Sequence, residues 1–272
     1  MMAEPNAANA GTITLGGELT VNRLGLGTNR IADNDASRAV LRRAVELGVN
    51  FIDTAEMYRQ SETIIGATLA PYPAGVVVST KGGVTQQFQV ANDPANIRRG
   101  VEQSLRLLRL EQLPFYFLHR LDPARADEAI GALRDLRAEG LIRHVALSDV
   151  TVEQVEYASR IVPIAAVQNE YNLLQRKHDA VVDYCAANGL GFFPWFPLSR
   201  GRYEAAEATL DEIAARHGAT CQQLALAWLL RRSPAMLPIP GTTSVEHLES
   251  NLAAATLALS DEDYAALDAL VA

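Results

Sequence analysis

The sequence has few cysteines, no long apolar run and no excess of basic residues. Its 272 residues include only Cys185 and Cys221, and no C-x-x-C pair, so it predicts neither a disulfide scaffold nor a metal site. No apolar run approaches the ~20 residues needed to span a membrane. The net charge of −8 argues against nucleic acid or an anionic membrane as a partner. Together these features favour a cytoplasmic protein without a nucleic-acid or membrane partner.

What the sequence does contain is a long alternation of short apolar runs with helical patterns. Eight such units follow one another without a linker, and 272 residues suit one barrel of eight βα units, which takes ~250. We therefore predict an α/β fold, a single (β/α)8 TIM barrel over residues 11–272, after a disordered tail over residues 1–10. Alternating residues around Gly16-Gly17 predict a β-hairpin before the barrel.

The predicted elements have these bounds. The barrel strands are expected at 24–28, 51–52, 76–79, 115–118, 144–147, 164–167, 191–195 and 236–239. Helices are expected at 36–47, 62–69, 94–109, 126–139, 178–188, 211–216 and 222–232, with two extra C-terminal helices at 245–254 and 261–269. Thr151 and Gln154 predict a capping box at the start of a further helix.

The second, third and fourth predicted strands are each followed by ionisable residues. Asp53 ends the second strand and precedes Tyr58, Lys81 follows the third, and His119 follows the fourth. In a parallel barrel these strand ends share the face that carries catalytic residues. A neighbouring Lys⁺ lowers the pKa of a tyrosine, so the set predicts Tyr58 as a general acid, with Asp53 holding Lys81 and His119 orienting a carbonyl oxygen. Taken alone, Asp53 and Tyr58 also fit an ordinary turn and a surface aromatic.

With these four residues the chain resembles the aldo-keto reductases. Asp53, Tyr58, Lys81 and His119 match that family's catalytic tetrad in order and approximate spacing, and the resemblance extends from about Gly11 to the C-terminus. It implies reduction of an aldehyde or ketone to an alcohol, by hydride from the nicotinamide of NADP(H) and a proton from Tyr58. It also implies that the predicted hairpin closes the bottom of the barrel.

The same resemblance implies a nicotinamide site at the later strand ends. Ser148 and Gln168 would bind the carboxamide, and Trp195 would stack under the ring. Asp149 stands where the family has an asparagine, and a carboxylate accepts a hydrogen bond from the amide but donates none. A helix-entry turn at Ser148 and Asp149, and a core position for Trp195, are the alternatives.

The segment before the helix expected at 245–254 predicts an anion site, since a helix start offers free N–H groups. The resemblance assigns it to the adenosine 2′-phosphate, although Gly241 and His247 replace the family's lysine and arginine. NAD(H) is the alternative coenzyme. The full set of predicted cofactor-binding residues is Ser148, Asp149, Gln168, Trp195, Phe196, Pro197, Leu198, Arg200, Arg202, Gly241, Thr242, Thr243, Ser244, His247 and Asn251.

The loops that would cover the substrate are short, so an open site is expected. Asn29, Met57 and Arg120 are the predicted substrate-binding residues, and residues 86–89 and Arg30 would add to its walls. The stretch over 167–172 and the short seventh loop are similar to a bacterial pyridoxal-reductase-like branch, which suggests pyridoxal-like aldehydes. A cofactor-binding redox sensor with slow turnover, and a barrel enzyme acting on sugar phosphates, are the alternative functions. The oligomeric state is open between a monomer and a small homo-oligomer.

Overall fold

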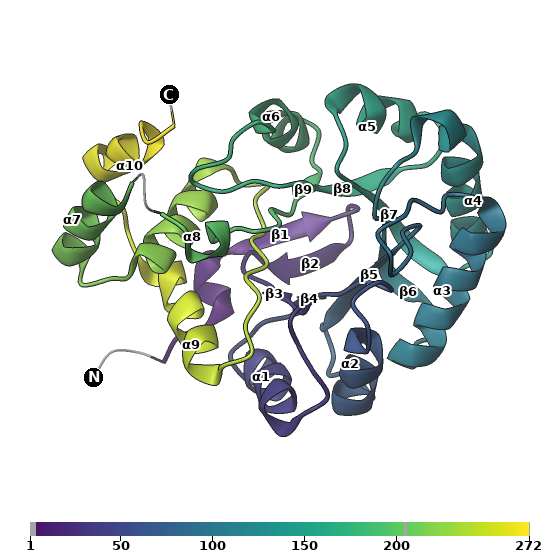
Figure 1. Cartoon of the computed structure of the whole chain (residues 1–272), viewed down its shortest axis with the longest axis horizontal. Coiled ribbons are helices and arrows are strands. Elements are labelled where there is room, and N and C mark those ends of the chain that lie inside the picture. Colours follow the sequence, from purple (N-terminus) through teal and green to yellow (C-terminus); the bar gives the residue numbers. More distant parts are fainter. Residues whose placement is uncertain (1–3, 204–205, 272) are drawn as a thin grey trace.

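A ring of parallel strands organises the computed structural model (Figure 1). The structure describes residues 4–203 and 206–271, apart from the side chain of Arg200. Seven strands pair in chain order within one parallel sheet. They are β3 (Leu26–Gly27), β4 (Phe51–Asp53), β5 (Val77–Gly82), β6 (Leu113–Leu118), β7 (Ile142–Ser148), β8 (Ile164–Gln168) and β9 (Gly191–Phe192).

The eighth predicted strand, over 236–239, lies between β9 and β3 but is not a regular strand. Leu237 donates its backbone N–H to the carbonyl of Phe192 (2.9 Å), and Gly25 donates to the carbonyl of Pro238 (2.9 Å). Pro238 and Pro240 have no N–H, so this segment cannot form a complete ladder. It still joins the two ends of the sheet, so the arrangement is the predicted (β/α)8 barrel.

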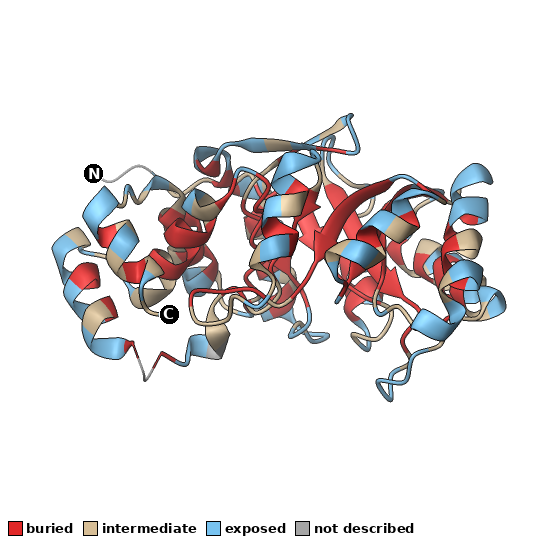
Figure 2. Cartoon of the chain, turned by 90° about the horizontal axis from the view of Figure 1, so that it is seen from above, coloured by how far each residue is buried: buried red, intermediate tan, exposed pale blue. Residues whose placement is uncertain are grey.

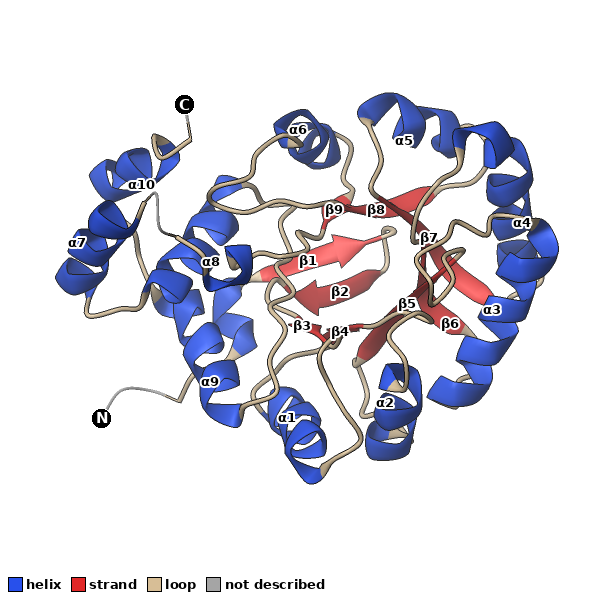
Figure 3. Cartoon of the chain, in the orientation of Figure 1, coloured by secondary structure: helices blue, strands red, loops and turns tan. Residues whose placement is uncertain are grey.

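Helices surround the ring on its outer side (Figure 3). They are α1 (Asp35–Glu46), α2 (Ser61–Leu69), α3 (Pro94–Leu108), α4 (Ala126–Ala138), α5 (Val152–Ser159), α6 (Asp179–Ala187), α7 (Glu207–His217), α8 (Cys221–Arg232), α9 (Val245–Ala253) and α10 (Asp261–Asp268). The predicted capping box of Thr151 and Gln154 starts α5. In the described part of the chain, no helix is long and apolar enough to cross a bilayer.

Two separate apolar clusters hold the barrel together. One lies between the strands and the helices, whose outer faces remain exposed (Figure 2). The other fills the barrel interior, where Phe51, Phe115 and Phe193 pack edge to face or tilted, with Phe51 and Phe193 4.9 Å apart between ring centroids. Leu15 and Val21 join this inner cluster from β1 (Thr12–Leu15) and β2 (Leu19–Asn22), an antiparallel pair. The predicted hairpin is therefore present and closes the barrel bottom.

The N-terminal segment differs from the predicted disordered tail. Ala7–Ala10 form a 3-10 helix, and the Asn6 side chain accepts a hydrogen bond from the N–H of Ala8. Ala7 is fully buried and donates its N–H to the carbonyl of Leu47 (2.9 Å). Ala7 and Ala10 pack into the apolar cluster between the strands and the helices. The composition of the segment alone does not predict this tertiary contact. Residues 1–3, the rest of that prediction, lie outside the described residues.

Candidate active site

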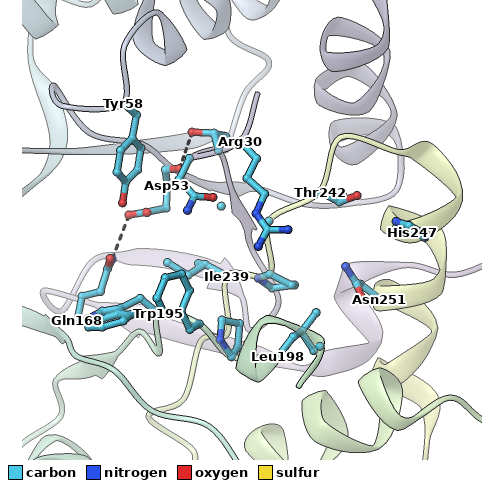
Figure 4. A pocket seen from close by; sticks show the side chains of 18 of the residues that line it. Arg30, Asp53, Tyr58, Gln168, Trp195, Leu198, Ile239, Thr242, His247 and Asn251 are labelled. Atoms are coloured by element: carbon cyan, nitrogen blue, oxygen red, sulfur yellow. Dashed lines mark hydrogen bonds between the residues drawn. The ribbon is translucent and has the colours of Figure 1, made fainter. Parts of the chain in front are cut away.

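A cavity of about 850 Å³ opens at the carboxyl ends of the strands. It is elongated: Tyr58, Gln168 and Trp195 lie at one end, and His247 and Asn251 lie at the other (Figure 4). The predicted residues that line it are Asn29, Asp53, Met57, Tyr58, His119, Arg120, Ser148, Asp149, Gln168, Trp195, Phe196, Pro197, Leu198, Gly241, Thr242, His247 and Asn251. The barrel thus brings together most of the predicted site.

Lys81 and Asp53 form a buried ion pair beneath one end of the cavity. The Lys81 ammonium lies 2.5 Å from Asp53 Oδ2 and 2.7 Å from the carbonyl oxygen of Thr54, to both of which it donates. Asp53 Oδ1 accepts from the hydroxyl of Ser79 at 2.9 Å and from Nε2 of Gln168 at 3.1 Å. Burial lowers the pKa of Lys81, but attraction to Asp53 and Tyr58 outweighs it and the net pKa is raised. Lys81 is therefore a fixed positive charge.

Tyr58 lies directly above this pair, with its ring centroid 5.1 Å from the Lys81 ammonium. Burial raises the pKa of Tyr58, and the positive charge of Lys81 only partly opposes that rise. The prediction of a net lowered pKa is therefore wrong for this structure, because desolvation of the phenolate outweighs attraction to Lys81. The consequence is that Tyr58 stays protonated at neutral pH, which is the form that a general acid requires.

His119 faces Tyr58, and the two rings meet edge to face with centroids 6.0 Å apart. Burial lowers its pKa to about 3, with further repulsion from Lys81 and Arg120. The imidazole is therefore neutral, and its buried Nδ1 has no hydrogen-bond partner among the described residues. An unpaired acceptor is tolerated better than an unpaired N–H in the interior, so we assign the proton to Nε2. That tautomer makes His119 a neutral donor.

Ser148 and Gln168 lie side by side at the ends of β7 and β8, where their backbones pair. The carboxylate of Asp53 can only accept, so the Gln168 side chain must present its nitrogen to it. That leaves the Gln168 oxygen as an acceptor at the cavity. The Ser148 hydroxyl has no partner in the described part of the chain and is available to donate. One donor beside one acceptor matches a primary amide.

Asp149 makes a different set of contacts from those predicted for it. Its Oδ1 accepts a hydrogen bond from the indole nitrogen of Trp195 at 3.0 Å, and its Oδ2 lies 3.6 Å from Nε of Arg120. The backbone at Asp149 has a φ of 55°, in the left-handed region. The carboxylate is thus engaged by Trp195 and Arg120, and it fixes the orientation of the indole.

At the opposite end of the cavity lie Thr242, in the loop just before α9, and Glu246 and His247, in its first turn. Ser244 is the N-cap of this helix, and its hydroxyl accepts from the N–H of His247 at 3.4 Å. The structure places neither Ser244 nor Thr243 among the residues that line the cavity. The capping role of Ser244 explains its position, since its hydroxyl satisfies a helix N–H.

Of the two predicted arginines after β9, the structure describes the side chain of Arg202 only, and Arg202 does not line the cavity. Arg202 is exposed and outside the cavity lining, because the 3-10 turn Ser199–Gly201 and the left-handed Gly201 (φ 74°) redirect the chain. The side chain of Arg200 lies outside the described residues. Arg30 instead lines the cavity from the loop after β3, and its guanidinium extends across it (Figure 4).

Comparison with known proteins identifies the family of the chain. The model of the aldo/keto reductase family matches residues 21–272. The chain belongs to the aldo/keto reductase family. Pyridoxine 4-dehydrogenase of Escherichia coli is 39% identical over 96% of this chain and 99% of its own length.

Two further comparisons agree with this family assignment. An uncharacterised oxidoreductase of Schizosaccharomyces pombe is 39% identical to this chain and covers 97% of it and 90% of its own length. The crystal structure of an aldo-keto reductase from Klebsiella pneumoniae in complex with NADPH has a TM-score of 0.83 and 31% identity, covering 95% of this chain and 94% of that one.

This aldo/keto reductase also has cavity residues that the sequence analysis missed. Thr220 and Gln222 line the cavity from the start of α8, and Ser250 lines it from α9. They add neutral polar groups to the cavity lining. The local sequence does not indicate that Thr220 and Gln222 line a cavity. Thr220 has the residue type typical of a helix N-cap, and it is also the N-cap of α8. Ser250 directly precedes Asn251, which was predicted.

The contacts of Asp149 lead to a prediction with two separate readouts. Asp149→Asn keeps an acceptor for the Trp195 indole and removes the negative charge beside Arg120, whereas Asp149→Ala removes both. We expect coenzyme affinity to fall by about three- to tenfold in the alanine variant only, because a partly exposed hydrogen bond contributes modestly. Both variants should lower KM for aldehydes that carry a carboxylate. Equal coenzyme affinities in the two variants would contradict the anchoring of Trp195.

Proposed function

We propose that the protein is an NADP(H)-dependent reductase of aldehydes or ketones. The observation that carries this proposal is the buried Lys81–Asp53 pair beneath Tyr58, with neutral His119 facing it across one end of an elongated cavity. Bound NADPH would supply a hydride from its nicotinamide. The proton donor and the groups that orient the substrate are side chains that the barrel already holds in place.

Four residues have separate roles in the protonation of the carbonyl oxygen. His119 donates its Nε2 proton to a hydrogen bond with the carbonyl oxygen and so orients it. Tyr58 transfers its phenolic proton to the same oxygen as negative charge develops there. Lys81 stabilises the resulting phenolate, and Asp53 keeps the ammonium charged and in position. A buried ammonium without Asp53 would tend to lose its proton.

The donors and acceptors of the cavity fit a nicotinamide dinucleotide. The Ser148 hydroxyl and the Gln168 oxygen suit a carboxamide, and Trp195, fixed by Asp149, offers a flat face beside them. The start of α9 lies at the far end, where its free N–H groups and dipole favour a phosphate. A volume of about 850 Å³ suits ligands of this size.

The substrate that we propose is a pyridoxal-like aldehyde. The likeness to pyridoxine 4-dehydrogenase over nearly the whole of both chains supports this choice. The test is a screen of NADPH oxidation over aldehydes that include pyridoxal, run in parallel with NADH. We expect turnover with pyridoxal to exceed turnover with small aliphatic aldehydes. No NADPH oxidation with any carbonyl compound would overturn the proposed function.

The far end of the cavity predicts only a moderate preference for NADPH. Thr242 and His247 stand where charged donors would bind a 2′-phosphate most tightly, and Glu246 adds an acid. Since neutral donors contribute less than charged ones, we expect NADPH to bind about ten- to a hundredfold more tightly than NADH, or roughly 1.4–2.8 kcal/mol. Trp195 fluorescence, quenched on binding, would measure both affinities.

Two substitutions on α9 test where the 2′-phosphate binds. His247→Arg and Glu246→Gln should each raise NADPH affinity and leave NADH affinity unchanged, because only NADPH carries that phosphate. Glu249→Gln is the matched control, since Glu249 lies on the same helix but pairs with Arg43 (2.8 Å) outside the cavity. If all three variants changed both affinities alike, the start of α9 would not be the phosphate site.

A further inference from the structure

The turn between β5 and α3 exposes an aromatic ring at the cavity. Phe88 is 68% exposed, more than any other large hydrophobic side chain in the described ranges, and it also lines the cavity. Val90, 43% exposed, lies on the same turn but does not line the cavity. A single exposed ring is common on a protein surface, but this one also lines a ligand-sized cavity, where apolar surface contributes to binding.

The turn that carries Phe88 is closed by several backbone contacts. Val84 and Val90 pair as an antiparallel bridge, and the N–H of Thr85 donates to the carbonyl of Gln89 at 2.8 Å. The N–H of Phe88 donates to the carbonyl of Thr85 at 2.9 Å. Phe88 itself has a φ of 62°, a left-handed conformation that suits glycine or asparagine much better than phenylalanine.

This turn stands beside the catalytic end of the cavity. Its base is fixed by Asn92, which donates to the carbonyl of Gly83 at 3.1 Å and accepts from the N–H of Asp122 at 2.7 Å. Asp122 follows closely after His119 and Arg120, and Gly83 follows Lys81. The turn therefore rises between the strand ends that carry the proposed catalytic residues, and its ring lines the cavity.

We propose that Phe88 is a specificity-determining residue that packs against the ring of an aromatic aldehyde. The inference rests on the proposed function, because it takes the group reduced at Tyr58 to be the aldehyde of that ring. Met57 and Trp195 line the cavity too, so a flat ring would meet apolar surface from more than one element. Aromatic pairs gain interaction beyond simple burial, and a short aliphatic aldehyde has no ring to form such a pair with Phe88.

The first test compares 4-nitrobenzaldehyde with butanal in Phe88→Ala. We expect kcat/KM for the aromatic aldehyde to fall about tenfold, mainly through KM, while that for butanal changes by less than about threefold. Val90→Ala is the matched control: it removes an exposed apolar side chain from the same turn and should leave both substrates unaffected. Equal losses for both aldehydes in Phe88→Ala would overturn the proposal.

A second variant separates a role in binding from a role in folding. Phe88→Gly relieves the left-handed conformation, so it should raise the midpoint temperature of unfolding while lowering kcat/KM for the aromatic aldehyde. A structural role predicts the opposite change in stability. NADPH binding must remain unchanged in every variant. If the unsubstituted protein reduced butanal but the Phe88 variants kept the preference for the aromatic aldehyde, the proposed function would stand and the role of Phe88 would be refuted. The absence of any turnover would overturn both.

Discussion

Tyr58→Phe is expected to lower kcat by ~10²–10⁴-fold, the range that general acid catalysis supplies. The substitution removes only the hydroxyl, so the edge-to-face contact with His119 and the position above Lys81 are kept. No other phenol lines the cavity in the described part of the chain, so no neighbouring tyrosine can replace the proton donor. Steady-state NADPH oxidation, followed by single-turnover measurement of the hydride step, would give the loss.

The controls for Tyr58→Phe separate chemistry from binding and folding. Coenzyme affinity, measured by quenching of Trp195 fluorescence, should change by less than about twofold. Tyr157→Phe is a matched control, because it deletes a tyrosine hydroxyl that bonds Asp127 on the surface, outside the cavity. It should leave kcat unchanged. A loss below about tenfold in Tyr58→Phe would show that another group protonates the substrate.

The sequence predicted which side chains meet at the Tyr58 end of the cavity, because strand ends identify them. Asp53, Lys81 and His119 each end or follow a short apolar run, and a parallel barrel places such positions on one face. The sequence order therefore determines which side chains meet, without knowledge of any single contact. The same argument located Ser148 and Gln168, whose backbones pair at the ends of β7 and β8.

Contacts that depend on the direction of a side chain could not be predicted in this way. The side chains of Ser244 and Arg202 lie outside the cavity lining, although both residues lie in the predicted segments. Asp149 was compared with an asparagine, yet its partners are Trp195 and Arg120, which come from two other strand ends. Each outcome is set by tertiary packing, which a pattern of residue types does not contain.

The pKa of Tyr58 shows the same limit for electrostatics. Sequence reasoning identified the neighbouring Lys81, whose charge favours the phenolate, but it did not include the burial of the phenol. Desolvation raises the pKa by more than Lys81 lowers it. Proximity of charges follows from fold and spacing, whereas desolvation depends on every loop that covers the group.

Lys81→Met should lower kcat by ~10²–10³-fold through loss of phenolate stabilisation. The pH dependence gives a sharper test than the rate. A general acid must be protonated, so the rate of reduction falls as the pH rises through the pKa of Tyr58. Because Lys81 opposes the rise of that pKa, removing it should move the alkaline limb of the profile to higher pH.

The same substitution leaves Asp53 as an unpaired charge that is 2% exposed, which is strongly destabilising, by about 3–5 kcal/mol. The double variant Asp53→Asn, Lys81→Met removes both charges, and the introduced asparagine would keep an oxygen for the hydroxyl of Ser79. We expect the double variant to regain most of the thermal stability while its kcat stays low and its alkaline limb stays displaced. Recovery of activity together with stability would mean that Lys81 only holds the barrel together. A low rate in a stable protein would identify Lys81 as the group that makes the Tyr58 proton transferable.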